Sequence, residues 1–495
     1  TDTTAVDRLA QIPAEDPAVY EALGRADTVG VFQIESRAQM SMLPRLKPKA
    51  FYDLVVEVAI VRPGPIQGGM VHPYLKRRMG QELPESPHPC LDPILHRTLG
   101  IPLFQEQVMQ IAITGAGYTG GEADQLRRDM AAWRRTGSLE RHRDRLKEGF
   151  LKSGISSEWA DRLFAQIQGF AEYGFPESHA SSFALLVYAS SWLKVHHPAA
   201  FVTALVNSLP MGFYSASTLF EDAKRHAVEL TPIDVNESGW DCSLPNASDG
   251  PDGTVRGPVR IGLALVKGLG EEQGRRIETE RRERGPFQTL EDFVARTGVA
   301  KDQLEHLAEA GALESITTTR RAALYRARAP RDGELFASHV IDPTEPVFAP
   351  LRATEQLVLD YARTGVSLGQ HPMAIVRPRL PARIKRSDAL KKGRDGTRVE
   401  VAGMVICRQR PATASGVVFF TLEDESGFVN LVVWSDTYER LKSVLNGSKL
   451  LRVRGKLQID PESRAVVHVV VESAEPLPLE LTGTVDIPTM SRDFH

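Results

Sequence analysis

The stretch Glu172-Tyr-Gly-Phe-Pro-Glu-Ser-His-Ala-Ser-Ser-Phe-Ala-Leu-Leu-Val-Tyr-Ala-Ser-Ser-Trp-Leu-Lys-Val-His-His-Pro198 decides the fold of the chain around it. Gly174 and Pro176 interrupt the backbone, the serines that follow can cap a helix start, and Pro198 cannot continue a helix. With a period of 3.6 residues, apolar side chains occupy both faces of the run, which predicts a buried central helix. His179 lies at its polar beginning.

Composition limits the classes of protein to consider. A chain of 495 residues allows about three domains on a prior of about 150 residues each. With 42% hydrophobic and 25% charged residues and a net charge of -3, it is typical of a soluble globular protein whose nucleic-acid contacts need local basic patches. We find no signal peptide and no apolar run of membrane-spanning length.

The three cysteines, Cys90, Cys242 and Cys407, lie far apart without metal-ligand spacing. This excludes a disulfide framework and a zinc ribbon, and it favours a reducing, cytoplasmic compartment. The chain begins Thr-Asp-Thr-Thr without methionine, which fits either an internal piece of a longer protein or trimming of a start residue.

The first 235 residues are predicted to be largely helical. The run Val61-Arg-Pro-Gly-Pro-Ile-Gln-Gly-Gly-Met70 forces a sharp loop with Arg62 at its entrance, although composition alone favours a plain connector. Thr119-Gly-Gly-Glu122 has capping-box spacing for a helix with a buried stripe. This stripe consists of Ala123, Leu126, Met130 and Trp133.

The same helix carries a ladder of positive charge. Arg127 and Arg134 are seven residues apart, as are Arg128 and Arg135, so each pair lies on one side about 10 Å apart along the axis. Doubled arginines present planar donors suited to phosphate oxygens. A solvated helix face explains the pattern equally well.

Residues 250–315 have the pattern of a tandem helix-hairpin-helix. In the run Ile261-Gly-Leu-Ala-Leu-Val-Lys-Gly-Leu-Gly270, a turn with Gly268 and Gly270 lets backbone N–H groups approach a phosphate, and Lys267 adds positive charge. An ordinary helical turn with a glycine cap is the alternative.

The last third of the chain predicts an OB barrel. Residues 316–398 are interpreted as a linker and a basic lead-in that contains Arg386, Lys391 and Lys392. Strand patterns at 399–407, 417–423 and 428–434, a helix near 437–445, and strands at 449–457 and 466–472 follow in the order of that barrel. Aromatic side chains suited to base stacking, some of which alternation turns into the core, are Phe419, Phe420, Phe428 and Trp434.

Several motifs together resemble the C-terminal portion of a bacterial C-family DNA polymerase, the family of the replicative alpha subunit. They are Thr28-Val-Gly-Val-Phe-Gln-Ile-Glu-Ser36, Arg62-Pro-Gly-Pro65, Phe104-Gln-Glu-Gln-Val-Met-Gln110, Gly117-Tyr-Thr119 with Leu126-Arg-Arg128, and Tyr173-Gly-Phe175 with Ser178-His179. Pro176 and Glu177 stand where replicative members tend to carry asparagine and lysine, so the chain most closely resembles the error-prone, translesion branch.

The resemblance implies a multidomain fold of mostly α-helical fingers and tandem helix-hairpin-helix, followed by an all-β OB barrel. The implied parts are 1–60 palm edge and fingers entry, 61–235 fingers, 250–315 duplex-gripping helix-hairpin-helix module, 316–398 linker, 399–475 OB domain facing single-stranded template, and 476–495 tail. The resemblance also implies that Arg127 and Arg128 hold the incoming triphosphate, with Arg62, Ser178 and His179 near the nucleotide. Ala131-Ala-Trp133 replaces the family's lysine-bearing continuation.

The activity implied by the resemblance is damage-tolerant DNA synthesis in DNA repair and replication. Its partners would be primer-template DNA, dNTPs, other translesion proteins and, indirectly, the sliding clamp, and Mg²⁺ would serve the full-length enzyme. Phosphoryl transfer by two metals needs close carboxylates, and the 495 residues contain no Asp-x-Asp pair. We therefore expect no catalytic or metal-ligating residue here, no phosphoesterase-like domain, and DNA binding without extension. The alternatives are a non-enzymatic DNA-binding accessory module and a replicative alpha subunit.

Overall fold

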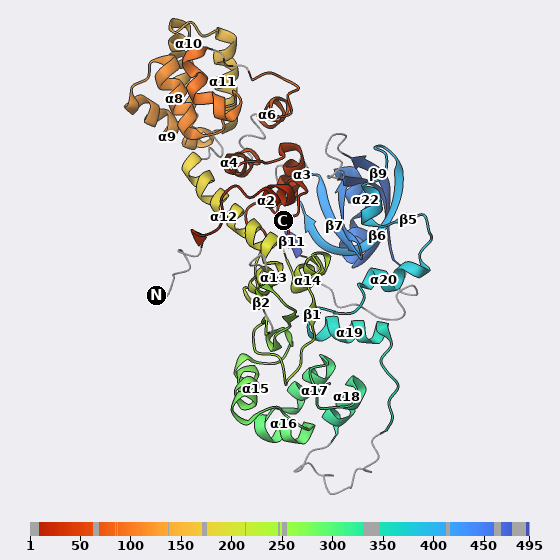
Figure 1. Ribbon diagram of the computed structural model, residues 1–495. Coiled ribbons are helices and arrows are strands. Elements are labelled where there is room, and N and C mark those ends of the chain that lie inside the picture. The colour runs from red at the N-terminus through yellow and green to blue at the C-terminus, as the bar shows by residue number, and fades with distance from the viewer. Residues whose placement is uncertain are drawn as a thin grey trace. The chain divides into compact units, whose positions relative to one another are not determined.

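The computed structural model divides the chain into two compact units, Thr1–Val195 and His196–His495 (Figure 1). It describes residues 9–62, 69–84, 86, 88–136, 138–170, 176–212, 214–245, 248–249, 255–329, 346–411, 416–459, 467–477 and 492–494. Among these residues, no helix combines the length and the apolar character that crossing a membrane requires.

The first unit is built from helices. They are α2 (Pro17–Gly24), α3 (Arg37–Leu46), α4 (Phe51–Ile60), α6 (Val71–Arg78), η1 (Pro89–Leu91), α7 (Asp92–Leu95), η2 (His96–Thr98), α8 (Gln105–Ala116), α9 (Gly120–Thr136), η3 (Ser138–His142), α10 (Arg143–Lys152), α11 (Ser157–Phe170) and α12 (Glu177–His196). The predicted capping box at the start of α9 is confirmed, because Glu122 accepts the Thr119 N–H at 2.7 Å and donates its own N–H to the Thr119 hydroxyl at 3.3 Å.

Helices α8 to α11 pack around a shared core. The predicted stripe on α9 contributes Ala123, Leu126 and Met130 to it, all nearly or fully buried. Trp133, the fourth predicted member, lies outside the side chains that the structure describes, as do Arg134 and Arg135. The stripe fixes which side of α9 faces outward, and that side carries the arginines.

The prediction that α12 is buried on both faces is wrong for the described helix. Ala184 and Val187 are fully buried, but Leu185 and Leu186 are 60% and 47% exposed. Periodicity records where apolar side chains lie and not what covers them, so it could not separate the two faces. The buried side is fixed by long-range bonds, including one from the Lys194 ammonium to the Val29 carbonyl at 2.9 Å.

The second unit begins with two helices and a helical module. Its elements before the barrel are α13 (Pro198–Asn207), α14 (Ala216–Arg225), β1 (Leu230–Thr231), β2 (Ser248–Asp249), β3 (Val255–Arg256), β4 (Val259–Arg260), η4 (Leu263–Leu265), α15 (Glu271–Arg284), α16 (Leu290–Thr297), α17 (Lys301–Glu309), α18 (Arg320–Arg328), α19 (Ala353–Arg363), α20 (Pro372–Val376), η5 (Arg377–Arg379), β5 (Ile384–Lys385) and α21 (Ser387–Leu390).

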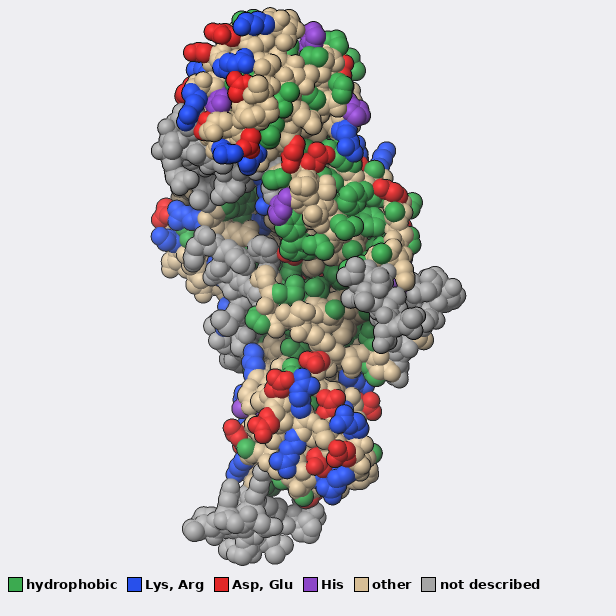
Figure 2. All heavy atoms as spheres, turned by 90° about the vertical axis from the view of Figure 1, so that its left-hand side faces the viewer, with side chains coloured by type: hydrophobic (Ala, Val, Ile, Leu, Met, Phe, Trp, Pro, Cys, Tyr) green, Lys and Arg blue, Asp and Glu red, His purple; other side chains and the backbone are tan. Residues whose placement is uncertain are grey.

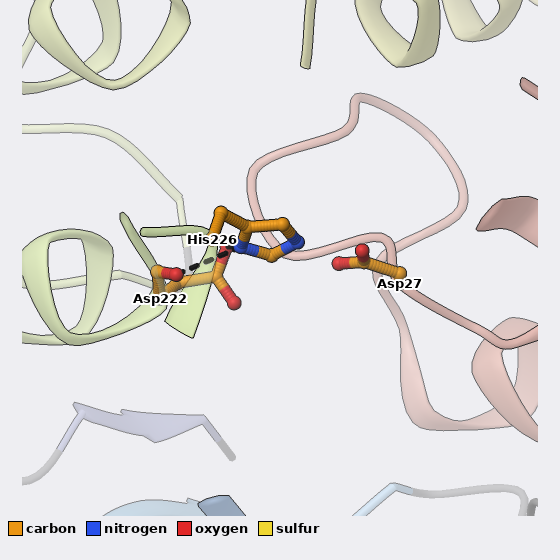
Figure 3. A group of neighbouring side chains, drawn as sticks. All are labelled: Asp27, Asp222 and His226. Atoms are coloured by element: carbon orange, nitrogen blue, oxygen red, sulfur yellow. Dashed lines mark hydrogen bonds and ion pairs between the residues drawn. The ribbon is translucent and has the colours of Figure 1, made fainter. Parts of the chain in front are cut away.

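The last turn of α14 is closed by a contact of the His226 side chain with Asp222. His226 Nδ1 lies 2.8 Å from the backbone carbonyl of Asp222 and 3.6 Å from its carboxylate (Figure 3). A carbonyl oxygen can only accept, so Nδ1 carries the hydrogen in this arrangement.

The segment 316–398, predicted as a linker, is largely structured where it is described. Asp360 in α19 accepts from Arg320 in α18 at 2.7 Å, and Tyr361 is buried, with its hydroxyl 3.2 Å from that of Ser217. The linker prediction was wrong for α18 and α19, which are joined by tertiary ion pairs, and for α20, which packs through the buried side chains of Met373 and Val376. Proline and charge content do not reveal such contacts.

The predicted barrel is confirmed. Its strands are β6 (Arg398–Gln409), β7 (Val418–Asp424), β8 (Gly427–Val433), β9 (Leu450–Ile459) and β10 (Val467–Pro476), with α22 (Ser435–Gly447) between β8 and β9. The order β6-β7-β8-β10-β9 closes through β6–β9 pairing, β8 and β10 run parallel, and β11 (Arg492–Phe494) pairs with β6. Alternating side chains such as Phe420, Leu431 and Val453 fill the interior.

Candidate nucleotide-binding and DNA-binding surfaces

The start of α12 is clamped by three other elements of the first unit. Glu106 at the start of α8 accepts the backbone N–H of Glu177 at 3.0 Å, so a carboxylate from another helix caps α12, and the predicted serine caps are not used there. The Glu177 carboxylate accepts from the Tyr52 hydroxyl at 2.8 Å and lies 4.0 Å from Arg97. Arg97 stacks over the Tyr52 ring at 4.3 Å.

This clamp presents an aromatic and apolar surface one turn further along α12. His179 is exposed and meets the Phe183 ring edge-on with centroids 4.3 Å apart, and Phe32 lies 5.4 Å from Phe183. Phe32 is 43% exposed. Figure 2 shows that hydrophobic side chains are exposed on the face that it displays. Ser178, also exposed, uses its carbonyl to accept from Ser182.

Arg62 lies at the end of α4, where its Nε donates to the Val58 carbonyl at 3.2 Å. Partial burial lowers the pKa of its guanidinium. The loop that follows, 63–68, lies outside the described residues, so the predicted turn there is not described.

Arg127 and Arg128 share one carboxylate on α9. Arg127 donates from Nε and one terminal nitrogen to Asp124 Oδ1 at 3.0 and 2.9 Å, and Arg128 donates in the same way to Oδ2 at 2.9 and 2.5 Å. Both arginine side chains remain substantially exposed, at 42% and 66%. Their hydrogen bonds hold the pKa of the Asp124 carboxyl below its usual range.

A buried polar network anchors the opposite side of the same helix. Asp129 accepts from Gln125 at 3.0 Å and lies 2.8 Å from His142 Nε2, while the Tyr118 hydroxyl lies 3.3 Å from His142 Nδ1. Asp129, His142 and Tyr118 are all nearly fully buried. Sequence reasoning missed the bonds of His142, because His142 is brought to Asp129 only by the packing of η3 against α9. It also missed Asp124, although its spacing of three and four residues from Arg127 and Arg128 on one helix could have indicated the ion pairs.

In the first hairpin of the helical module, Lys267 is bonded to α19 of the same chain. Lys267 donates its backbone N–H to Arg363 at 2.8 Å and its ammonium to the carbonyls of Tyr361 and Ala362 at 3.2 Å. Gly268 has φ +89° and lies against the His306 ring, so a side chain there would be strained. Gly270 precedes α15 as its N-terminal cap. Lys267 thus holds α19 in place, and its role as a DNA contact stays a prediction.

On the barrel, the aromatic candidates divide between core and surface. Phe420 is fully buried, whereas Trp434 is 57% exposed and Phe419 points outward from β7. Phe428 lies beneath the Arg225 guanidinium at 4.8 Å. Alternation along β7 turns Phe419 outward, and Trp434 is exposed just after β8, so these two remain the candidates for stacking.

The basic lead-in contains two kinds of cation. Arg386 forms an ion pair with Asp388. Lys391 and Lys392 are exposed, and no carboxylate of the described residues pairs with their ammonium groups. Cations of this kind contribute an electrostatic surface for an anionic polymer.

Three family models match the chain in this order. Residues 2–154 match the bacterial DNA polymerase III alpha subunit finger domain, residues 227–323 match a helix-hairpin-helix motif, and residues 399–477 match an OB-fold nucleic-acid-binding domain. Error-prone DNA polymerases from Pseudomonas fluorescens and Pseudomonas aeruginosa are 53% and 52% identical to it over 98% of its length. One from Anaeromyxobacter is 51% identical over 99%.

The chain is related to the bacterial error-prone DNA polymerases. It spans about half the length of these curated relatives, 47%, 46% and 43% of each. The finger-domain match includes Arg62, Arg127 and Arg128, and it ends before Ser178 and His179. The predicted fold class and the predicted family are both confirmed.

Proposed function

We propose that this chain provides the nucleotide-binding and DNA-binding part of an error-prone DNA polymerase, which synthesises DNA across damaged template. The observation that carries the proposal is the exposed pair Arg127 and Arg128, held on α9 within the segment that matches the finger domain. Guanidinium groups are planar, permanently charged donors that bind phosphate oxygens well. In this proposal they receive the triphosphate of the incoming dNTP.

The surface around His179 would contact the new base pair. A base needs a flat, partly apolar partner, and Phe32, His179 and Phe183 form one at the clamped start of α12. Arg62 and Ser178 would lie beside it. Pro176 and Glu177 are then the residues through which this branch would alter pairing stringency, because Glu177 fixes where α12 begins.

The second unit would hold the DNA. Backbone groups near Gly268 and Gly270 would contact product duplex, and Phe419 and Trp434 would stack on template bases, with Arg386, Lys391 and Lys392 near the phosphates. We keep the predicted domain boundaries, except that α18, α19 and α20 are folded helices and not parts of a linker.

The residues of this chain do not fit a catalytic magnesium site. The sequence has no Asp-x-Asp pair, and within either unit taken alone the described residues form no cluster of three metal-ligating side chains. When bound in the longer enzyme, Mg²⁺ would activate the primer hydroxyl and neutralise phosphate charge. We propose that its ligands lie in a palm outside these 495 residues, that the enzyme is cytoplasmic, and that other translesion proteins connect it to the clamp.

Primer extension tests the proposal. The 495-residue chain should retard a primer-template in a gel-shift assay and leave the primer unextended with Mg²⁺ and dNTPs. Fused behind the amino-terminal half of the Pseudomonas fluorescens relative, it should extend the primer. Extension by the chain alone would refute the placement of catalysis elsewhere, and absence of DNA binding would refute the assignment of the second unit.

A further inference from the structure

The outward face of β6 and β9 carries more positive charge than its own carboxylates neutralise. Inward positions such as Val401 and Val453 fill the barrel, so the alternating positions face out. Arg398 lies opposite Lys456, and Glu400 lies opposite Arg454. Arg452, next along β9, completes the row.

One carboxylate arranges three of these guanidinium groups. Glu400 accepts from Arg452 at 2.7 Å, from Arg454 at 2.8 Å and from Arg383 at 3.1 Å. Burial raises the pKa of the Glu400 carboxyl, but the hydrogen bonds from Arg452 and Arg383 outweigh it and hold that pKa below its usual range. An arginine has five N–H donors, so each group keeps donors for a further anion.

The row continues into the turn before β6. Gly396 donates its N–H to the Leu457 carbonyl at 2.8 Å, and Leu457 donates to Thr397 at 2.8 Å, which fixes the 391–397 turn against the end of β9. Lys391, Lys392 and Arg394 in this turn are exposed. The turn therefore places its cations beside Arg398 and Lys456.

We infer that this row extends the phosphate contacts proposed for Lys391 and Lys392 along β6 and β9, as a DNA-binding surface that contacts the phosphate backbone without reading or stacking bases. We call it the basic stripe, and its members are Arg383, Lys391, Lys392, Arg394, Arg398, Arg452, Arg454 and Lys456. Four carboxylates, Glu400, Glu472, Glu475 and Asp395, lie among these eight cations.

The charges and side-chain types of the basic stripe indicate which ligand it binds. The outward residues Arg398 and Glu400 of β6 and Arg452, Arg454, Lys456 and Gln458 of β9 include no aromatic side chain, so base stacking is not available there. Successive outward residues of a strand lie about 7 Å apart, and an array of this kind suits a repeating anion. The inference rests on the barrel alone and does not depend on the nucleotide site of the first unit.

Salt-dependent binding tests the stripe. The variant Arg398→Gln with Lys456→Gln in the 495-residue chain is compared with Lys152→Gln plus Arg162→Gln, a matched loss of one lysine and one arginine from exposed positions of the first unit. The probes are a 30-base-pair duplex and a 30-nucleotide poly-dT strand, both fluorescently labelled. Near 150 mM salt we expect a five- to tenfold loss of affinity for the DNA form that the stripe holds.

The slope of log K against log salt should fall by about 1.8 for duplex or about 1.4 for single strand, corresponding to two lost phosphate contacts. A change confined to duplex assigns the stripe to product DNA, and one confined to poly-dT assigns it to template. If the double variant binds both probes as the control does, with an unchanged slope, the inference is wrong. Circular dichroism and thermal unfolding verify that both variants fold.

Discussion

The arginine pair of α9 and the lysines of the barrel unit are held in opposite ways. On α9, both arginines are bonded to Asp124, and at the start of α12 the Glu177 carboxylate is bonded across elements to Tyr52. In the barrel unit, Lys391, Lys392 and Lys456 are exposed without a carboxylate partner among the described residues. The first arrangement suits a discrete ligand in one geometry, whereas the second suits a polymer bound through counterion release.

The largest effect is expected at the arginine pair. Arg127→Ala with Arg128→Ala, in the fusion with the amino-terminal half of the relative, should lower kcat/KM for dNTP by roughly 100-fold, because hydrogen bonds to charged groups contribute about 1.5 to 3 kcal/mol each. Affinity for primer-template should change less than twofold. Steady-state extension and fluorescence anisotropy measure the two quantities, and Lys152→Ala with Arg162→Ala is the control. An equal loss of DNA affinity would make the pair part of a general basic surface.

A second prediction concerns a buried carboxylate of the barrel that has no hydrogen-bond partner among the described residues. Glu423 is fully buried, its nearest cation is Arg225 at 3.6 Å, and burial raises its pKa to about 8. The folded state therefore keeps a proton that the unfolded chain loses above about pH 4.5. Stability from this proton is fully present at lower pH and is lost as the pH rises towards 8.

Glu423→Gln should remove that dependence. Relative to the parent, the variant should gain on the order of 3 kcal/mol in the free energy of unfolding between pH 5 and pH 8, since each pKa unit corresponds to about 1.4 kcal/mol. Urea titrations at several pH values measure it, with the exposed Glu439→Gln as control. Parallel pH profiles for parent and variant would show that Glu423 is ionised in the folded protein.

The third prediction concerns the lysines of the barrel unit. Lys391→Glu with Lys392→Glu should weaken poly-dT binding about tenfold and flatten its salt dependence, because a single strand loses about 0.7 in slope for each phosphate contact. Fluorescence anisotropy across a salt series measures both. Unchanged binding would show that Lys391 and Lys392 lie in a solvated turn that does not contact DNA. The two units would then differ in how their charges are bonded but not in how they bind ligands.

The two units also differ in how much of their structure could be predicted from the sequence. Alternation along β7 sets both the strand and its faces, so Phe419 outward and Phe420 inward follow from a period of two. On α12, the helical period located the helix but not the exposure of Leu185. The contacts of Glu106 with Glu177 and of Asp129 with His142 join residues 71 and 13 positions apart. No local pattern encodes such pairs, because they depend on how helices pack.

The smallest effect is expected from Asp124→Asn, and it tests what the carboxylate does for its arginines. Exposed ion pairs of this kind contribute little to stability, so a triphosphate can displace Asp124 at little cost. If Asp124 occupies the place of a phosphate until nucleotide arrives, its neutralisation should strengthen dATP or tripolyphosphate binding to the 495-residue chain about fivefold, as the lost competition of two such pairs predicts. Isothermal titration calorimetry measures this, with Asp161→Asn, which removes the exposed partner of Lys147, as the matched control. Weaker binding by Asp124→Asn would instead show that the carboxylate orients the guanidinium groups for the ligand, and the discrete character of the α9 site would then depend on Asp124 itself.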